Sequence, residues 1–251
     1  MFWGVDIGST YTKIIGIGRE REIVHSAVIP TIFNQDKIVG EYLEDKEVKM
    51  LVATGYGRYM LEDSHGAPVI SEIKAHAKGA YFFEPDVATV IDLGGQDSKV
   101  IKMGEDGSFT DFRMNDKCAA GTGKFLEIAA NRLGLEMEAF ANAGFAHDKE
   151  LTISSMCAVF AESEVISLIA KKESLANICY GVHESIASRL ASMARKFVIK
   201  ESETIVFTGG GALNPFLHYM LEKKLERTIV IPKHPQLMGA VGAALSGFEV
   251  F

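Results

Sequence analysis

The sequence of 251 residues predicts an α/β protein built from two similar halves. One observation is an internal repeat, in which Val5–Lys13 (VDIGSTYTK) aligns with Ile91–Lys99 (IDLGGQDSK). A second is the alternation of strand-like and helix-like segments along the chain, which is typical of α/β architectures. A third is the glycine turn Gly209–Gly211, which lies between an expected strand and an expected helix. Because each copy of the repeat opens one half of the chain, we expect duplicated domains that face each other.

Each copy of the repeat is expected to form a β-hairpin. The apolar, Asp, Gly and Lys positions coincide in the two windows. Both windows continue into apolar stretches, residues 14–18 and 100–104, and both then reach a polar turn. Strand-like runs joined by Gly and polar residues are typical of hairpins.

The remaining elements follow from apolar patterns and from breaker residues. Strands are expected at residues 50–54, 204–207 and 228–231. Helices are expected over residues 70–82, 124–133, 158–172, 175–197, 213–225 and 239–245. Pro85 and Asp86 mark a boundary, so residues 89–238 form one predicted domain and residues 1–88 the other.

Composition narrows the classes of function. The net charge of −7 argues against a general nucleic-acid-binding protein, because phosphate neutralisation needs clustered Lys and Arg. No apolar run is long enough to span a bilayer, and the first residues lack the pattern of a secretory signal. A cytoplasmic protein without membrane contact is therefore expected, and its three cysteines do not form a disulfide framework.

The two hairpin turns suit nucleotide phosphates. Glycine lets the backbone approach closely, so that N–H groups can point at phosphate oxygens. Asp6 and Asp92, at the ends of strands, could hold Mg²⁺ through its waters, and Lys13 could neutralise phosphate charge. The alternative is a pair of ordinary hairpin turns with solvated Asp side chains.

The glycine turn adds a third element, since a strand, glycine turn and helix can hold a nucleotide's sugar or phosphate at the helix N-terminus. No G-x-G-x-x-G follows the first strand and no P-loop is present. Together the three elements resemble the actin, Hsp70 and sugar-kinase superfamily. That resemblance implies two ribonuclease-H-like domains with ATP and Mg²⁺ in an interdomain cleft, which opens and closes with nucleotide state. The predicted catalytic residues are Asp6, Asp92 and Gln96, and the predicted nucleotide-binding residues are Gly8, Ser9, Thr10, Lys13, Gly94, Gly95, Gln96, Gly121, Thr122, Gly123, Gly209, Gly210 and Gly211.

Two cysteines, Cys118 and Cys157, each precede an expected helix. A thiolate at a helix N-terminus is stabilised by the helix dipole and could bind a metal. Two thiolates cannot complete the four-cysteine set of a cubane cluster, but a two-fold dimer would supply the other pair. The alternative is that both are buried thiols that act as small apolar residues.

The motifs around these cysteines are more specific. The segments Asp92–Lys99, Asn115–Gly123 (NDKCAAGTG) and Cys157–Val165 (CAVFAESEV) closely resemble the activator ATPases of 2-hydroxyacyl-CoA dehydratases and the ATPase subunits of benzoyl-CoA reductases. The resemblance extends over essentially the whole chain. It implies a homodimer with one [4Fe–4S] cluster ligated by Cys118 and Cys157 of both subunits. It also implies ATP hydrolysis coupled to delivery of a strongly reducing electron, and an exposed cluster that is sensitive to oxygen. The same resemblance places residues 239–251 with the first domain.

The implied partners are a reduced ferredoxin or flavodoxin as electron donor and an iron–sulfur dehydratase or reductase as acceptor. Two other functions stay open: a small-molecule kinase of the same fold, with Asp97 as its candidate catalytic Asp near the γ-phosphate, and an actin-like filament or scaffold. Cys179 is expected to be a buried thiol, and the sequence assigns no role to His76 or Arg58. Glu162 and Glu164 are either helix-start acids or contacts to the nucleotide or cluster.

Overall fold

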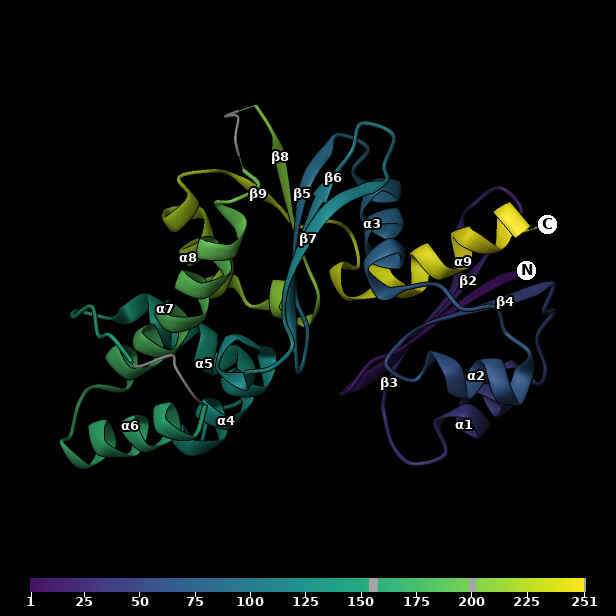
Figure 1. Cartoon of the computed structure of the whole chain (residues 1–251). Helices are drawn as coiled ribbons and strands as arrows, with labels where there is room; N and C mark the ends of the chain where they lie inside the picture. The colour runs from purple at the N-terminus through teal and green to yellow at the C-terminus, as the bar shows by residue number, and fades with distance from the viewer. Residues whose placement is uncertain (154–157, 199–201, 251) are drawn as a thin grey trace. The chain divides into compact units, whose positions relative to one another are not determined.

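The computed structural model describes residues 1–153, 158–198 and 202–250, and these residues form two compact units (Figure 1). Unit 1 comprises Met1–Val87, Met103–Asp111 and Pro232–Phe251. Unit 2 comprises Ala88–Lys102 and Phe112–Ile231. No helix within the described ranges is long and apolar enough to cross a membrane.

Unit 1 contains a four-stranded sheet in the order β3-β2-β1-β4. The strands are β1 (Phe2–Ile7), β2 (Tyr11–Ile17), β3 (Ile23–Pro30) and β4 (Met50–Gly55). β2 pairs antiparallel with both β1 and β3, whereas β4 lies parallel to β1. Every residue of β1 is buried because helices cover both faces of this central strand, which accounts for its nearly continuous apolar sequence.

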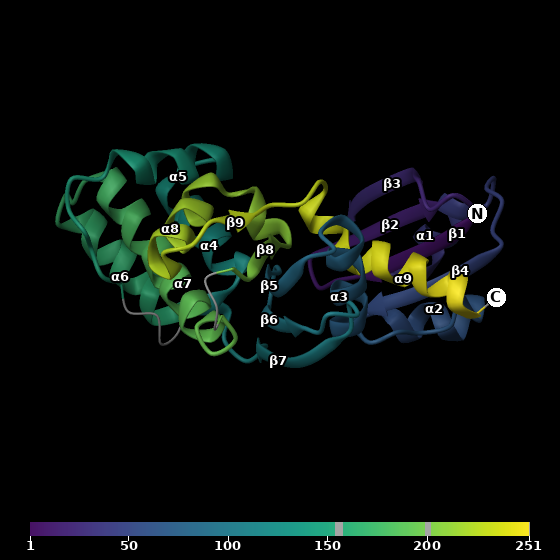
Figure 2. The same ribbon diagram turned by 90° about the horizontal axis from the view of Figure 1, so that it is seen from above.

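Helices pack on both faces of this sheet (Figures 1 and 2). On one face, α1 (Gln35–Leu43) and α2 (Arg58–His65) pack against the Trp3, Val5 and Ile7 side chains. On the other, α9 (Met238–Val250) packs against Ile15 and Ile17, and α3 (Glu72–Phe83) lies beside α9. The last described helix of the chain therefore packs on its first strands.

Unit 2 contains a five-stranded sheet in the order β7-β6-β5-β8-β9. The strands are β5 (Val87–Leu93), β6 (Ser98–Met103), β7 (Phe109–Asn115), β8 (Thr204–Thr208) and β9 (Ile229–Val230). The first four strands have the same order as those of unit 1. The register also repeats, because Asp6 lies opposite Lys13 in one hairpin and Asp92 lies opposite Lys99 in the other. The duplication inferred from the sequence is therefore present in the strand order and the strand register.

The helices of unit 2 gather on one side of its sheet around a single large core (Figure 1). They are α4 (Gly123–Leu133), α5 (Met137–Ala143), α6 (Ala158–Ala170), α7 (Leu175–Ala194) and α8 (Pro215–Leu225), with short 3₁₀ turns η1 (Ala119–Gly121), η2 (Gly144–Ala146) and η3 (Gly210–Leu213); a fourth, η4 (Pro235–Leu237), precedes α9 in unit 1. The core joins the β5 and β8 side chains, such as Ile91 and Phe207, to α7 and α8.

The predicted α/β fold is confirmed, with helices packed on two sheets. Helix ends differ slightly from expectation: α3 begins at Glu72 because Ser71 caps it, and α8 begins at Pro215 because Asn214 caps it. The predicted domain limits, 1–88 with 239–251 and 89–238, stay a prediction. The units formed by packing place Met103–Asp111 and Pro232–Phe251 with unit 1.

Candidate functional site

The first Asp–Lys turn lies at the carboxyl end of β1. Gly8, Ser9 and Thr10 connect β1 to β2, and Gly8 N donates a hydrogen bond to the Tyr11 carbonyl at 3.2 Å. Lys13 Nζ lies 3.4 Å from Asp6 Oδ2. The Lys13 side chain is 20% exposed to solvent, whereas the Asp6 side chain is 3% exposed. The ammonium group can therefore reach a ligand at this turn while it neutralises Asp6.

The other oxygen of Asp6 is a buried acceptor with no hydrogen-bond partner among the described residues. A buried carboxylate oxygen without a partner is costly, so a water or another donor is expected beside it. Gly55 at the end of β4 has a φ of +83°, and a side chain there would collide with Asp6 Oδ1 and the Ile7 carbonyl. A glycine at this position leaves room beside the carboxylate.

The second Asp–Lys turn, in unit 2, has a different internal arrangement. Lys99 Nζ lies 2.7 Å from Asp97 Oδ1 and 3.5 Å from Asp92 Oδ2. Thr208 Oγ1 donates to Asp92 Oδ1 at 2.9 Å from the neighbouring strand β8. The Lys99 side chain is only 1% exposed, so its charge is neutralised inside the protein. Of the two equivalent lysines, Lys13 is therefore the more accessible.

Two of the predicted glycine motifs lie side by side in unit 2. Gly123 N donates to the Gly94 carbonyl at 2.9 Å, and Lys124 N donates to the Gly95 carbonyl at 2.8 Å. The first turn of α4 is thereby held against the turn that follows β5. Gly121 and Thr122 precede this helix, and Gln96 is exposed in the same turn.

The third motif meets the end of the same strand. Gly209 has a φ of +84°, and a side chain there would collide with the Leu93 carbonyl, while a side chain at Gly211 would collide with Leu93 itself. Gly210, between them, faces open space. In unit 2 the structure therefore brings together Asp92, the turn at Gly94 and Gly95, the start of α4 and the turn Gly209–Gly211.

Comparison with known proteins identifies the family. Residues 3–247 match the BadF/BadG/BcrA/BcrD ATPase family. The chain belongs to this family. Its sequence is 40% identical over 254 residues to the (R)-2-hydroxyglutaryl-CoA dehydratase activating ATPase of Acidaminococcus fermentans, covering 98% of this chain and 96% of that protein. It is 38% identical over 254 residues to the activator of lactoyl-CoA dehydratase of Anaerotignum propionicum, covering 98% of this chain and 96% of that protein.

A solved structure agrees in fold over the whole chain. The activator of the 2-hydroxyisocaproyl-CoA dehydratase from Clostridium difficile, with bound ADPNP, superimposes with a TM-score of 0.90 at 35% identity, covering 100% of this chain and 95% of that chain. Together with the family match, this confirms the resemblance identified from the sequence motifs. Like the other BadF/BcrA-type proteins, this chain is an ATPase.

The cysteines of this ATPase lie in three different settings. Cys118 is half-buried, and the Asn115 side-chain amide donates to its carbonyl at 2.9 Å. Cys157 lies outside the described residues. Cys179 is fully buried in α7, and burial raises the pKa of its thiol to about 12. A thiol with so high a pKa is protonated at neutral pH and is a poor metal ligand.

The helix-dipole reasoning for Cys118 was wrong. Cys118 precedes η1, a 3₁₀ turn of 3 residues, and α4 starts only at Gly123. The thiol therefore has no α-helix N-terminus directly behind it. Within residues 1–153, 158–198 and 202–250, no three His, Cys, Asp or Glu side chains gather as a metal site.

Other residues singled out in the sequence have structural contacts. Arg58 Nη1 donates to the Gly55 carbonyl at 3.0 Å, and its guanidinium lies over the Tyr59 ring. Glu162 forms an ion pair with Arg132 of α4. His76 is buried on α3 close to Asp6.

Sequence reasoning missed Lys99 and Thr208 as partners of Asp92. The aligned repeats contain the signal, because Asp97 occupies the place of Tyr11 two residues before the lysine. An extra carboxylate on the same strand face as the lysine indicates an internal ion pair.

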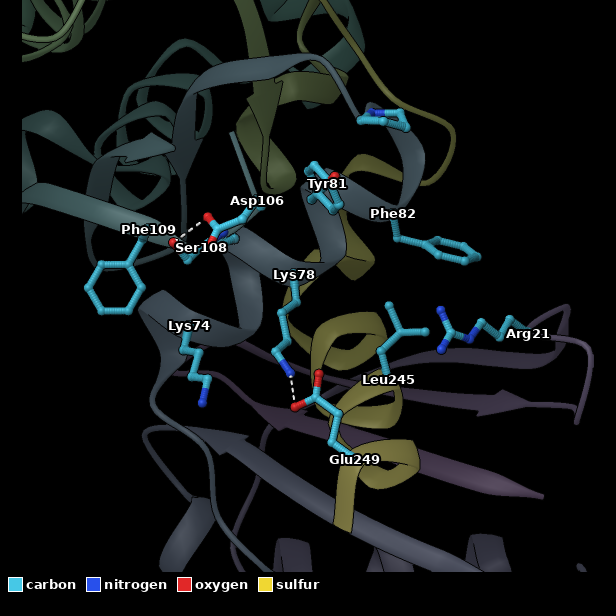
Figure 3. A pocket seen from close by; sticks show the side chains of 13 residues that line it. Arg21, Lys74, Lys78, Tyr81, Phe82, Asp106, Ser108, Phe109, Leu245 and Glu249 are labelled. Carbon is cyan, nitrogen blue, oxygen red and sulfur yellow. Dashed lines mark hydrogen bonds and ion pairs between the residues drawn. The ribbon is translucent and has the colours of Figure 1, made fainter. Parts of the chain in front are cut away.

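A hollow of about 590 Å³ on unit 1 is separate from these turns (Figure 3). It lies along α3 and the end of α9, and none of the predicted site residues lines it. Its Lys78 and Glu249 side chains pair with each other, and Asp106 accepts hydrogen bonds from Ser108, as the dashed lines in Figure 3 show. Three of its charged side chains, Lys78, Glu249 and Asp106, therefore have partners within the protein.

Proposed function

We propose that this ATPase is an activator that couples ATP hydrolysis to the delivery of a low-potential electron to an iron–sulfur acyl-CoA dehydratase. The observation that supports this proposal most is that the chain aligns with nearly the full length of named dehydratase activators at 38–40% identity. The two Asp–Lys turns of matching register support it further. A small-molecule kinase is less well supported, because its candidate catalytic residue Asp97 is only 4% exposed and is bound to Lys99. A reductase as acceptor remains the second candidate of the same class.

The nucleotide is proposed to bind at the two Asp–Lys turns and at the turn Gly209–Gly211. Lys13 would contact phosphate oxygens, and the backbone N–H groups of Ser9, Thr10, Gly95 and Gln96 would line the phosphates. Gly8 and Gly94 would keep these turns tight, because their own N–H groups donate to the Tyr11 and Asp97 carbonyls. Asp6 fits an ion site, because its Oδ1 is buried and lacks a partner among the described residues, as an acceptor for an Mg²⁺-bound water would. Asp92, bonded to Thr208, would be the second acceptor. Bound Mg²⁺ would neutralise phosphate charge.

The iron–sulfur cluster is proposed to lie on the dimer axis, ligated by Cys118 and Cys157 of each subunit. The setting of Cys118 fits a ligand, because its thiol is half-buried rather than fully enclosed and its backbone is held by Asn115. Cys179 does not fit, because its thiol is buried and protonated. With Cys157 as the second ligand, each chain would supply two cysteines and a dimer four, which is the number that a cubane cluster requires. When bound, the cluster would supply one-electron transfer between a ferredoxin or flavodoxin and the partner enzyme.

The cluster is tested by metal analysis of anaerobically purified protein. Wild type is expected to hold about four irons per dimer. Cys118→Ser and Cys157→Ser are expected to lose iron, visible colour and electron delivery together. Cys179→Ser is the matched control and is expected to keep all three. A count of about four irons per monomer, or a Cys157→Ser variant that keeps its cluster, would overturn the bridging arrangement.

A further inference from the structure

The His76 imidazole lies beside the Asp6 carboxylate, 70 positions along the chain from it. His76 is 6% exposed and Asp6 is 2% exposed. A side chain added at Gly239 would lie 2.9 Å from Asp6 Oδ2 and 3.0 Å from His76 Nε2. Both polar atoms therefore converge on one point at the first turn of α9.

Close helix packing produces this convergence. A side chain at Gly79 of α3 would collide with the Met238 carbonyl, and one at Gly242 of α9 would collide with the Ala75 carbonyl. The backbones of α3 and α9 are therefore in direct contact, which glycine alone permits. The contact brings residue 76 of α3 and residue 239 of α9 to the carboxyl end of β1, where Asp6 lies.

Ionisable side chains surround Asp6. Glu72 Oε1, one turn before His76 on α3, lies 3.8 Å from His76 Nε2. Lys13 Nζ lies 3.4 Å from Asp6 Oδ2. Asp6 Oδ2 is thus flanked by the lysine and the imidazole, whereas Oδ1 is the buried oxygen without a partner among the described residues.

We propose that His76, oriented by Glu72, is a positioning residue for Asp6 in ATP hydrolysis. Lys13 holds Asp6 through Oδ2 and the His76 ring limits the movement of the carboxylate on the α3 side, so that Oδ1 stays oriented toward the water or hydrated Mg²⁺ that satisfies it. Side chains that orient a metal-binding or water-binding carboxylate commonly contribute 10–100-fold to metal affinity or activity. The proposal rests on the role of Asp6 under the proposed function and is independent of the cluster and of the electron acceptor.

The competing explanation is that His76 only fills space between α3, α9 and β1. His76→Phe separates the two explanations, because it keeps a planar ring of similar size and removes both nitrogens. His76→Gln keeps a polar amide at a similar reach, and Glu72→Gln removes the charge that orients the ring. His65→Gln, on exposed α2, is the matched control.

The assays use the full chain and need no cluster. They are ATP turnover as a function of Mg²⁺ concentration, Mg²⁺-dependent binding of ADP by calorimetry, and the melting temperature. His76→Phe is expected to lower kcat and to raise the half-saturating Mg²⁺ concentration by about 10–100-fold, with Mg²⁺-free ADP binding unchanged. Glu72→Gln is expected to shift both quantities in the same direction by less, and His76→Gln to restore most of the loss.

Wild-type kcat and Mg²⁺ dependence in His76→Phe would overturn the proposal. If His76→Phe fails to fold, unchanged Mg²⁺ dependence in both His76→Gln and Glu72→Gln would overturn it equally. These measurements do not depend on the cluster, so a result that disproves the cluster or electron delivery would not affect them. Wild type that shows no Mg²⁺-dependent ADP binding would instead defeat the assignment of Asp6.

Discussion

The two equivalent lysines are expected to differ in what they stabilise. Lys99 is enclosed by Asp92 and Asp97, and the three residues are 1%, 1% and 4% exposed. Lys99→Met keeps the length and the apolar stem of the side chain but leaves two carboxylates buried without their cation. Removal of one partner from a buried ion pair costs about 3–5 kcal/mol.

This cost predicts a large thermal shift. For a chain of this size, each kcal/mol lowers the melting temperature by about 2–4 °C, so Lys99→Met is expected to melt roughly 6–20 °C below wild type. The Lys13 side chain is 20% exposed, and a partly exposed pair is worth about 1 kcal/mol or less. Lys13→Met is therefore expected to melt within about 4 °C of wild type.

Nucleotide binding is expected to show the opposite order. Lys13→Met should lose most of its Mg²⁺-ATP affinity because a charge-assisted phosphate contact is removed. The assays are melting curves by circular dichroism and ATP binding by calorimetry below the transition. Asp97→Asn added to Lys99→Met should recover part of the stability, since it removes one uncompensated charge. A Lys99→Met variant that melts within about 4 °C of wild type, or a Lys13→Met variant with unchanged ATP affinity and turnover, would refute the reasoning.

Two further predictions concern unit 2. Gly209→Ala is expected to reduce stability by more than about 1 kcal/mol, because a positive φ and the Leu93 carbonyl oppose a side chain. Gly210 faces open space, so Gly210→Ala is expected to melt like wild type and to weaken only ATP binding. Equal melting temperatures for the two variants would contradict this prediction. Burial lowers the pKa of His183 from 6.5 to about 4, so that below pH 6.5 the unfolded chain binds a proton that the native protein does not. The free energy of unfolding is therefore expected to fall by roughly 3 kcal/mol as the pH falls from 6.5 to 4. In urea titrations, the unfolding free energy of His183→Gln should depend less steeply on pH than that of wild type. The same pH dependence in both proteins would exclude His183 as the cause.

Much of the fold was predictable from local sequence. The hairpin at Asp6, the hairpin at Asp92 and the strand before Gly209 follow from apolar runs bounded by turn residues, and all are present. The elements α1, α2, α5, β3 and β7 were not predicted. α1 and α2 are short and bury few side chains, so their apolar periodicity is weak. β3 is an edge strand whose Ile23–Pro30 alternation was a usable signal.

By itself, the sequence determined the duplicated Asp–Lys turns, the glycine turn after β8, the family and the cysteine pair to test. These depend on residue types at fixed short spacings, which local chemistry controls. Only the tertiary structure decided that Thr208 donates to Asp92, because the two residues lie on neighbouring strands 116 positions apart in the chain. It also decided that His76 and Gly239 meet at Asp6. Contacts between residues 70 and more than 230 positions apart arise from helix packing against the sheet, and no local pattern encodes that geometry.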